Sequence, residues 1–134
     1  MNKQKGFTII ELIVVIAIIA VLAAIVLVNV TQYINKGKDA AVKGNMSTIL
    51  TNAAIWIDTP ANSGVYTGFS ANALYSGPAA AITSASAAPA YVGTTSAFCV
   101  TALLKDATTY CVDSTGFKGT LVSGKCTGST YTCN

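Results

Sequence analysis

The sequence from Lys5 to Val28 reads KGFTIIELIVVIAIIAVLAAIVLV, and it contains the longest apolar run in the chain. From Leu12 to Val28, seventeen consecutive positions hold only Ala, Val, Ile or Leu. Between Phe7 and Val30 there is one charge, Glu11, and neither Gly nor Pro. These residues would form a helix of ~36 Å, enough to cross a hydrocarbon core of about 30 Å. A backbone in lipid must satisfy its own hydrogen bonds, so the sequence predicts one membrane-length helix over 7–30.

The composition limits the classes of function that the remaining residues can support. The chain has 134 residues, of which 10% are charged, with no His and a formal net charge of +3. This charge is too small for the electrostatic footprint of a nucleic-acid-binding protein. The lack of His removes the commonest general base and metal ligand. No paired carboxylates, Ser/His/Asp set or phosphate-binding glycine loop occurs. We therefore expect neither an enzyme nor a nucleic-acid partner.

Two simple interpretations of the apolar run leave Glu11 unexplained. A cleaved secretory signal peptide has a shorter apolar run with its cut site after it, whereas Ala23 and Ala24 lie inside this one. A plain membrane anchor fits the length alone. A carboxylate in an apolar helix costs on the order of 3 kcal/mol without a partner, unless it snorkels to the headgroups. No cation lies on a neighbouring turn. We therefore expect the partner of Glu11 to come from another chain.

The stretch from Lys5 to Glu11, KGFTIIE, followed by the apolar run, resembles the signature of type IV pilins and of type II secretion pseudopilins. In that family, a prepilin peptidase cuts after the Gly and N-methylates the new terminal residue. The resemblance implies cleavage between Gly6 and Phe7, N-methylation of Phe7, and a register-setting role in assembly for Glu11, fifth after the cut. A Glu11 carboxylate would then meet the Phe7 ammonium group of a neighbouring subunit. The basic leader 1–6 would stay cytoplasmic, because Lys3 and Lys5 follow the positive-inside rule.

The resemblance also implies partners and a location. Many pilins carry a Pro in the apolar helix, which this chain lacks, so we expect a more continuous helix here. The expected partners are other copies or other pilins, the prepilin peptidase, an assembly ATPase and a platform membrane protein. Before assembly the chain would be a single-pass protein of the cytoplasmic (inner) membrane with a cytoplasmic N-terminus. After assembly it would lie in an extracellular or periplasmic filament.

The second part of the helix is predicted from apolar periodicity. One helical face collects apolar residues at spacings of three and four, and these are Val42, Met46, Ile49, Leu50, Ala53 and Ile57. Residues 31–57 are therefore an amphipathic continuation, ended by Thr59-Pro60. Residues 58–96 form a variable loop region with short strands expected around Val65–Phe69 and Tyr91–Gly93. A short helix within 79–88 is the open alternative for that run.

Residues 97–134 are predicted to form a small antiparallel β-sheet. Two short runs, Ala97–Leu103 and Thr108–Val112, flank Lys105-Asp106 as a hairpin, and a third strand is expected in Lys118–Ser123. The predicted class is therefore α+β, a long N-terminal helix whose second half packs on this sheet. The globular domain would span 31–134.

Four cysteines fall within the last 36 residues, and in an exported domain they are expected to form two disulfides. Three pairings are possible, and we expect Cys99–Cys111 across the hairpin and Cys126–Cys133 around a short loop. A zinc site is disfavoured, because no Cys-x-x-Cys knuckle occurs. The sequence Asp113-Ser114-Thr115 could offer oxygens to calcium, but Asp commonly starts a β-turn, so we expect no metal and no cofactor.

We therefore expect a structural subunit of a type IV pilus-like filament, serving surface adhesion, motility or DNA uptake. One alternative is a pseudopilin that moves folded proteins across the envelope in type II secretion. The other is a minor pilin that acts as a binding module at a filament tip. Residues 58–134 contain three Lys and three Asp, so their net charge is zero. This balance argues against a DNA receptor.

Overall fold

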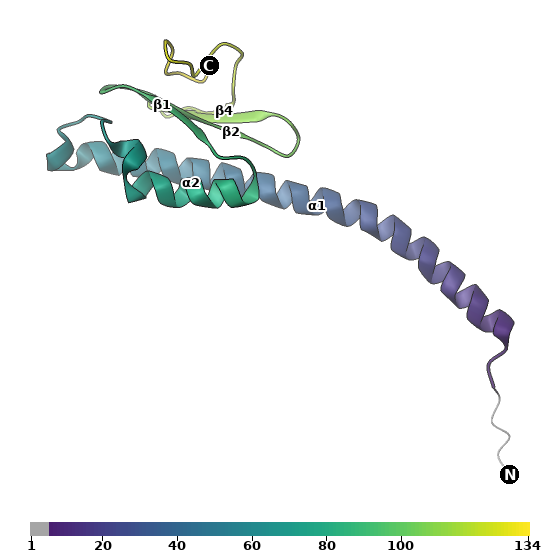
Figure 1. Cartoon of the computed structure of the whole chain (residues 1–134). Coiled ribbons are helices and arrows are strands. Elements are labelled where there is room, and N and C mark those ends of the chain that lie inside the picture. Colours follow the sequence, from purple (N-terminus) through teal and green to yellow (C-terminus); the bar gives the residue numbers. More distant parts are fainter. Residues whose placement is uncertain (1–5) are drawn as a thin grey trace. The chain divides into compact units, whose positions relative to one another are not determined.

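A computed structural model describes residues 6–134 of the chain (Figure 1). Its helices are α1 (Ile9–Asp58), η1 (Pro60–Asn62), η2 (Phe69–Ala71) and α2 (Ala73–Ala85), and its strands are β1 (Ala90–Gly93), β2 (Phe98–Leu103), β3 (Thr109–Asp113) and β4 (Lys118–Thr120). The chain divides into two compact units. The first unit ends at Ile34, and the second begins at Asn35. Each unit is described by itself.

The apolar run and the amphipathic run form one secondary-structure element, as the sequence predicts. Helix α1 begins at Ile9 and ends at Asp58, one residue before Thr59-Pro60. The hydroxyl of Thr59 donates to the carbonyl of Ile55 (3.0 Å), and Pro60 starts η1. Proline lacks the N–H that another helical turn would need, which explains the position of this end.

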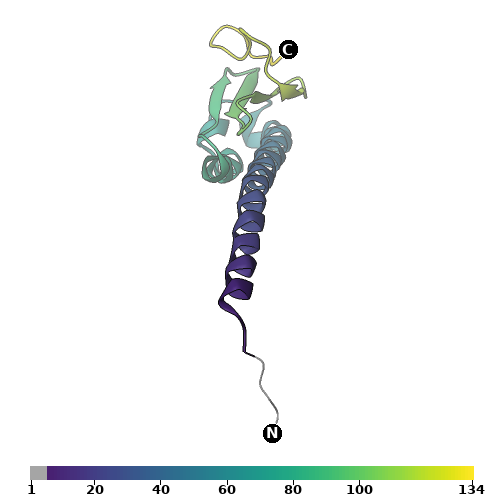
Figure 2. The same ribbon diagram turned by 90° about the vertical axis from the view of Figure 1, so that its right-hand side faces the viewer.

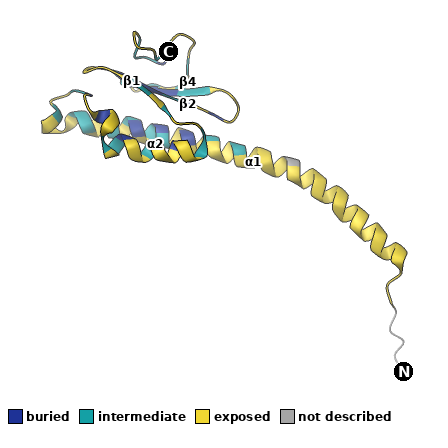
Figure 3. Cartoon of the chain, in the orientation of Figure 1, coloured by how far each residue is buried: buried dark blue, intermediate teal, exposed yellow. Residues whose placement is uncertain are grey.

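The predicted apolar face of α1 makes one side of the core. Val42, Met46, Ile49 and Ala53 are buried, while Leu50 and Ile57 are partly buried against them. Figure 3 shows this burial on the C-terminal half of α1. Figures 1 and 2 show α2 beside the same part of α1, with one face of the sheet over both.

The region between α1 and the sheet differs from the sequence prediction. The expected strand at Val65–Phe69 is wrong, because the chain makes tight turns there. Gly64 and Gly68 adopt positive φ (77° and 81°), a conformation that an extended strand excludes. A helix does form in the alanine-rich run, but it already starts at Ala73. Asn72 caps it by accepting a hydrogen bond from the Leu74 N–H (2.9 Å).

The sheet is antiparallel with strand order β1-β2-β3-β4. The strands predicted at Tyr91–Gly93, Ala97–Leu103, Thr108–Val112 and Lys118–Ser123 correspond to β1 to β4, with β4 shortened to Lys118–Thr120. Side chains alternate across the sheet, so Val100 and Val112 join the core with α1. Cys99 and Cys111 lie in a second buried cluster, together with Cys133 of the C-terminal segment. The fold is therefore α+β and pilin-like.

Candidate functional site: the helix start and the disulfide-bonded segment

The predicted site at the amino terminus centres on Glu11, in the first turn of α1. Its Oε2 accepts hydrogen bonds from the backbone N–H (2.8 Å) and the hydroxyl (2.9 Å) of Thr8. In return, the Glu11 N–H donates to the Thr8 hydroxyl oxygen (3.2 Å). These reciprocal bonds form a capping box, in which a Thr and a Glu three residues later satisfy free donors at a helix start. Glu11 thus has a partner inside its own chain.

Sequence reasoning missed Thr8, although the signal was available. The spacing Thr8-x-x-Glu11 before an apolar run is the sequence pattern of a capping box. Thr8 is uncharged, so it is not among the cations that could pair with Glu11, but its N–H and hydroxyl are hydrogen-bond donors. The capping bonds orient the carboxylate and reduce the cost of its burial in lipid, but they do not neutralise its charge. The need for a cation in an apolar environment therefore remains.

The residues around the predicted cleavage site are exposed. Gly6 is exposed, and a Cβ at this position would have no heavy atom within 4 Å. Phe7 is 87% exposed and precedes the first turn of α1. The leader residues Lys3 and Lys5 lie outside the residues that the structure describes. Both residues of the predicted cleavage site are therefore exposed in the described part of the chain.

Helix α1 starts with large apolar side chains that contact no core. From Ile9 to Leu27 these side chains are about half exposed or more, for example Ile16 at 56% and Leu27 at 73%. An 18-residue window of α1 has a mean hydropathy of 3.3 and is 0% buried. Exposure of this apolar surface to water is unfavourable, because burial of apolar area is the main favourable term in folding and association. The helix is long and apolar enough to cross a membrane.

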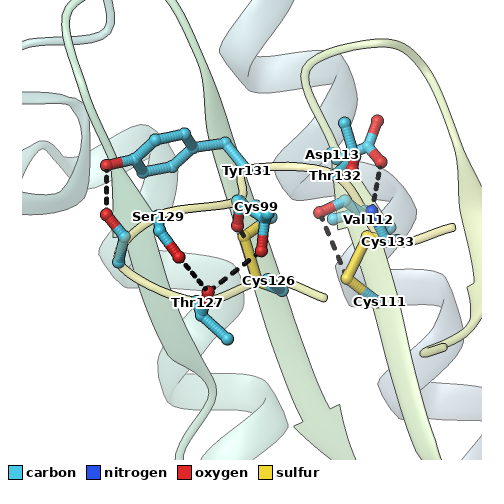
Figure 4. The surroundings of a disulfide bond; sticks show 12 residues. Cys99, Cys111, Val112, Asp113, Cys126, Thr127, Ser129, Tyr131, Thr132 and Cys133 are labelled. Atoms are coloured by element: carbon cyan, nitrogen blue, oxygen red, sulfur yellow. Dashed lines mark hydrogen bonds between the residues drawn. A yellow bond between two sulfur atoms is a disulfide. The ribbon is translucent and has the colours of Figure 1, made fainter. Parts of the chain in front are cut away.

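The second predicted site, the cysteine-rich segment, contains two disulfides as expected, but the predicted pairing is wrong. Cys99 is bonded to Cys126 and Cys111 to Cys133, with Cα–Cα distances of 5.7 and 5.8 Å (Figure 4). Each bridge therefore joins the sheet to the C-terminal segment, and neither joins two strands of the sheet. With every cysteine bonded, zinc has no thiolate ligand here.

The register of the hairpin explains the error. The prediction centred the turn on Lys105, which would place Cys99 opposite Cys111. Instead Cys99 pairs with Asp113, and Cys111 pairs with Thr101. The turn is centred one residue later, at Asp106, and the next residue, Ala107, adopts a positive φ of 66°. Glycine usually fills this left-handed position in three-residue hairpin loops, so an alanine there gave no signal.

Asp113 stands beside the second disulfide and is fully buried. Its Oδ1 accepts hydrogen bonds from the N–H and hydroxyl of Thr115 (2.9 and 2.5 Å) and from the N–H of Phe117 (3.4 Å). Its Oδ2 accepts the N–H of Cys133 (2.8 Å; Figure 4). Asp113 thus starts a β-turn, as predicted, and also fixes the C-terminal segment, which sequence reasoning missed.

The geometry of Asp113 bears on the calcium alternative. Calcium binds six to eight oxygens, commonly with several carboxylates. Both oxygens of Asp113 are directed to N–H and O–H donors of its own chain, which compete with a cation for the same lone pairs. Among residues 6–134, no group of three or more His, Cys, Asp or Glu side chains is arranged to hold a metal ion.

Comparison with known proteins identifies the N-terminal segment. Residues 1–27 match the family of the prokaryotic N-terminal methylation motif. This motif is the class III prepilin signal typical of type IV pilins and pseudopilins, which are typically non-enzymatic structural proteins. It implies processing by a prepilin peptidase. No curated protein and no solved structure gives a significant match to the chain.

Proposed function

We propose that this chain, a type IV pilin-like prepilin with a methylation motif, is a structural subunit that polymerises through the first part of α1. The observation that carries the proposal is the exposed apolar helix behind the motif, with a carboxylate in its first turn. In the membrane, lipid covers this helix. In a filament, the helices of other copies would cover it, and the folded unit Asn35–Asn134 would form the outer surface.

Cleavage between Gly6 and Phe7 would create the cation that Glu11 lacks. The new α-amino group of Phe7 lies four residues before Glu11, a rise of ~6 Å along a helix. The Phe7 ammonium of one copy can therefore meet the Glu11 carboxylate of a copy shifted along the filament axis. Each charge reduces the desolvation cost of the other, so the pair favours one axial register. Helical packing between translated copies leaves a free binding surface at each end, which produces an open filament.

In this role the chain carries out no catalysis. The prepilin peptidase would act on the chain as its substrate, and an assembly ATPase and a platform membrane protein would drive polymerisation. Before assembly, the helix would hold the chain in the cytoplasmic membrane. The proposed boundaries are a leader 1–6, a membrane and filament-core helix 7–30 and a globular domain 31–134.

Intact mass spectrometry tests processing and oxidation together. The chain is expressed with its peptidase, and the mass is measured in sheared-surface and membrane fractions. We expect a chain that begins at Phe7, heavier by one methyl group and lighter by four hydrogens for two disulfides. Its presence in the sheared fraction supports a surface filament. A chain cut after the apolar run, or left uncut, would show that the helix is an export signal or a plain anchor.

Substitution of Glu11 tests the assembly step. Glu11→Gln keeps an oxygen that can accept the Thr8 hydrogen bonds but removes the charge, whereas Thr8→Val removes the side-chain cap and keeps the charge. We expect both variants to be cleaved and inserted. Filament yield should fall at least tenfold in Glu11→Gln, since an unpaired ammonium is left in an apolar environment, and much less in Thr8→Val. Wild-type filament yield from Glu11→Gln would refute the proposed pairing.

A further inference from the structure

An exposed stripe runs along α1 within the second unit. At ~100° per residue, these positions fall on one side of the helix. We define the α1 stripe as Lys36, Ala40, Lys43, Ser47, Thr51, Ala54 and Asp58. Ser47 is half-buried and the other six are exposed. The stripe begins with a lysine and ends with an aspartate, and all residues between them except Lys43 have small side chains. The buried face of α1, centred on Met46 and Ile49, points elsewhere.

Asp58 has no partner of its own. Four of the five side-chain carboxylates in residues 6–134 accept hydrogen bonds, and Asp58 is the one that accepts none. It is the last residue of α1, and the last turn contains no basic residue. A negative charge at a helix C-terminus is unfavourable, because it adds to the negative end of the helix dipole. A cation from outside the chain would relieve both conditions.

The surface beside Asp58 fits a lysine. A shallow hollow there is lined by Thr51, Ala54, Ile55, Ile57 and Asp58. Ile55 is 54% exposed, so the hollow offers apolar contact next to a carboxylate. Lysine has this dual character, because its methylene stem packs on apolar groups while its ammonium remains free to pair.

The other end of the stripe supplies such a lysine. Lys36 lies 22 residues before Asp58, within about 40° on the helix and ~33 Å away along its axis. Lys43 is already engaged, with its ammonium 5.8 Å from the ring centre of Tyr110. Lys38 lies about 200° around the helix from Lys36, off the stripe.

Two glycines next to the stripe also favour contact with another helix. A Cβ at Gly37 or Gly44 would meet no heavy atom within 4 Å, so packing inside the chain does not require glycine there. Each costs the helix roughly 1 kcal/mol relative to Ala. Small residues on a helix surface allow the backbone of a second helix to approach closely.

We propose that the α1 stripe docks a second copy of this chain, with Lys36 of one copy on Asp58 of the other. For parallel copies, as in the proposed filament, Lys36 of one copy comes level with Asp58 of the other after an axial shift of ~33 Å, the distance between the two ends of the stripe. The two stripes then meet at their charged ends. This contact is heterologous, so it leaves an unpaired Lys36 at one end and an unpaired Asp58 at the other, and it extends as an open chain. The inference rests on the proposed filament and adds an axial spacing between contacting copies.

A charge exchange tests the contact in the full chain, co-expressed with its assembly machinery. Lys36→Asp and Asp58→Lys should each lower sheared-filament yield about tenfold, which corresponds to ~1.4 kcal/mol in one equilibrium. The double variant Lys36→Asp/Asp58→Lys should restore the yield, because the pair is re-formed with reversed charges. Lys38→Asp, with the same change off the stripe, should assemble like wild type. Failure of the double variant to recover, while wild type assembles, would overturn the inference.

Cross-linking gives a second, independent readout. Copies with Lys36→Cys and copies with Asp58→Cys are co-expressed, and sheared filaments are analysed on non-reducing gels. We expect disulfide-linked dimers, and none when Lys38→Cys replaces Lys36→Cys. Filaments without a Lys36→Cys/Asp58→Cys dimer would refute the docking but leave the proposed function intact. An absence of filaments from wild type would refute the proposed function and, with it, this inference.

Discussion

The two units of the molecule use the same kind of residue for opposite purposes. Ile16 and Ile49 lie on one helix, α1, yet Ile16 is 56% exposed and Ile49 is fully buried. In the unit that ends at Ile34, every side chain whose burial the structure describes is exposed, and none of them forms a core. The unit Asn35–Asn134 has a core, a sheet and two disulfides. Apolar residues thus stabilise the fold in one unit, and in the other they are available for association.

Truncation of one isoleucine in each unit tests this difference most directly. Ile49→Ala should lower the free energy of unfolding by about 2–5 kcal/mol, because it leaves a cavity in a closed core. Ile16→Ala should change it by less than about 0.5 kcal/mol, because no packed neighbour is lost. Fluorescence of Trp56, the single tryptophan, monitors denaturant unfolding of the full chain in detergent. Equal losses would mean that Ile16 also belongs to an intramolecular core.

The disulfides should have the next largest effect, and only on the second unit. Cys111→Ser/Cys133→Ser opens a bridge between residues 22 positions apart and should cost about 2–4 kcal/mol of unfolding free energy. Peptide mapping without reduction should recover Cys99 linked to Cys126 and Cys111 linked to Cys133. Helicity of the first unit should not change. Recovery of a Cys99–Cys111 peptide would instead support the hairpin pairing expected from sequence.

The sequence prediction was correct for features that depend on residues close together in the chain. Helix α1 and its buried face were predictable, because a run of seventeen apolar residues and then a periodic pattern leave few alternatives. The four strands were also recognisable from short β-branched and apolar runs. These features are local, in that each depends on residues close together in the chain.

The errors concern contacts that local patterns do not determine. The disulfide pairing depended on the register of one hairpin, and Ala107 in a left-handed conformation shifted that register by two residues. The strand expected at Val65–Phe69 included Gly68 and began directly after Gly64, and the positive φ of both glycines makes turns there instead. Asp113 was correctly placed in a turn, but its bond to Cys133 spans 20 residues and no local rule reveals it.

The smallest effect we predict is an alkaline loss of stability that is confined to the second unit. Tyr66, Tyr75 and Tyr91 surround Phe69 and Phe98, and burial raises the pKa of all three hydroxyls. For Tyr91, burial and the neighbouring tyrosines raise the pKa from 10.0 to about 12. A tyrosine with a raised pKa in the folded state contributes its full stability below the unfolded value. That contribution is lost as the pH rises through 10 toward 12, because the unfolded chain ionises first.

The midpoint temperature of thermal unfolding of the full chain in detergent should therefore be constant between pH 7 and 9. It should fall between pH 10 and 12. Tyr91→Phe should reduce the slope in this range, because Phe has no hydroxyl to ionise. Tyr33→Phe is the matched control in the first unit, where Tyr33 is 72% exposed, and it should leave the slope unchanged. Ultraviolet absorbance of tyrosinate should show delayed ionisation in wild type and less delay in Tyr91→Phe. The same slope in Tyr91→Phe and wild type would mean that the Tyr91 hydroxyl is hydrated in the folded state, and that the aromatic core is open to water at β1.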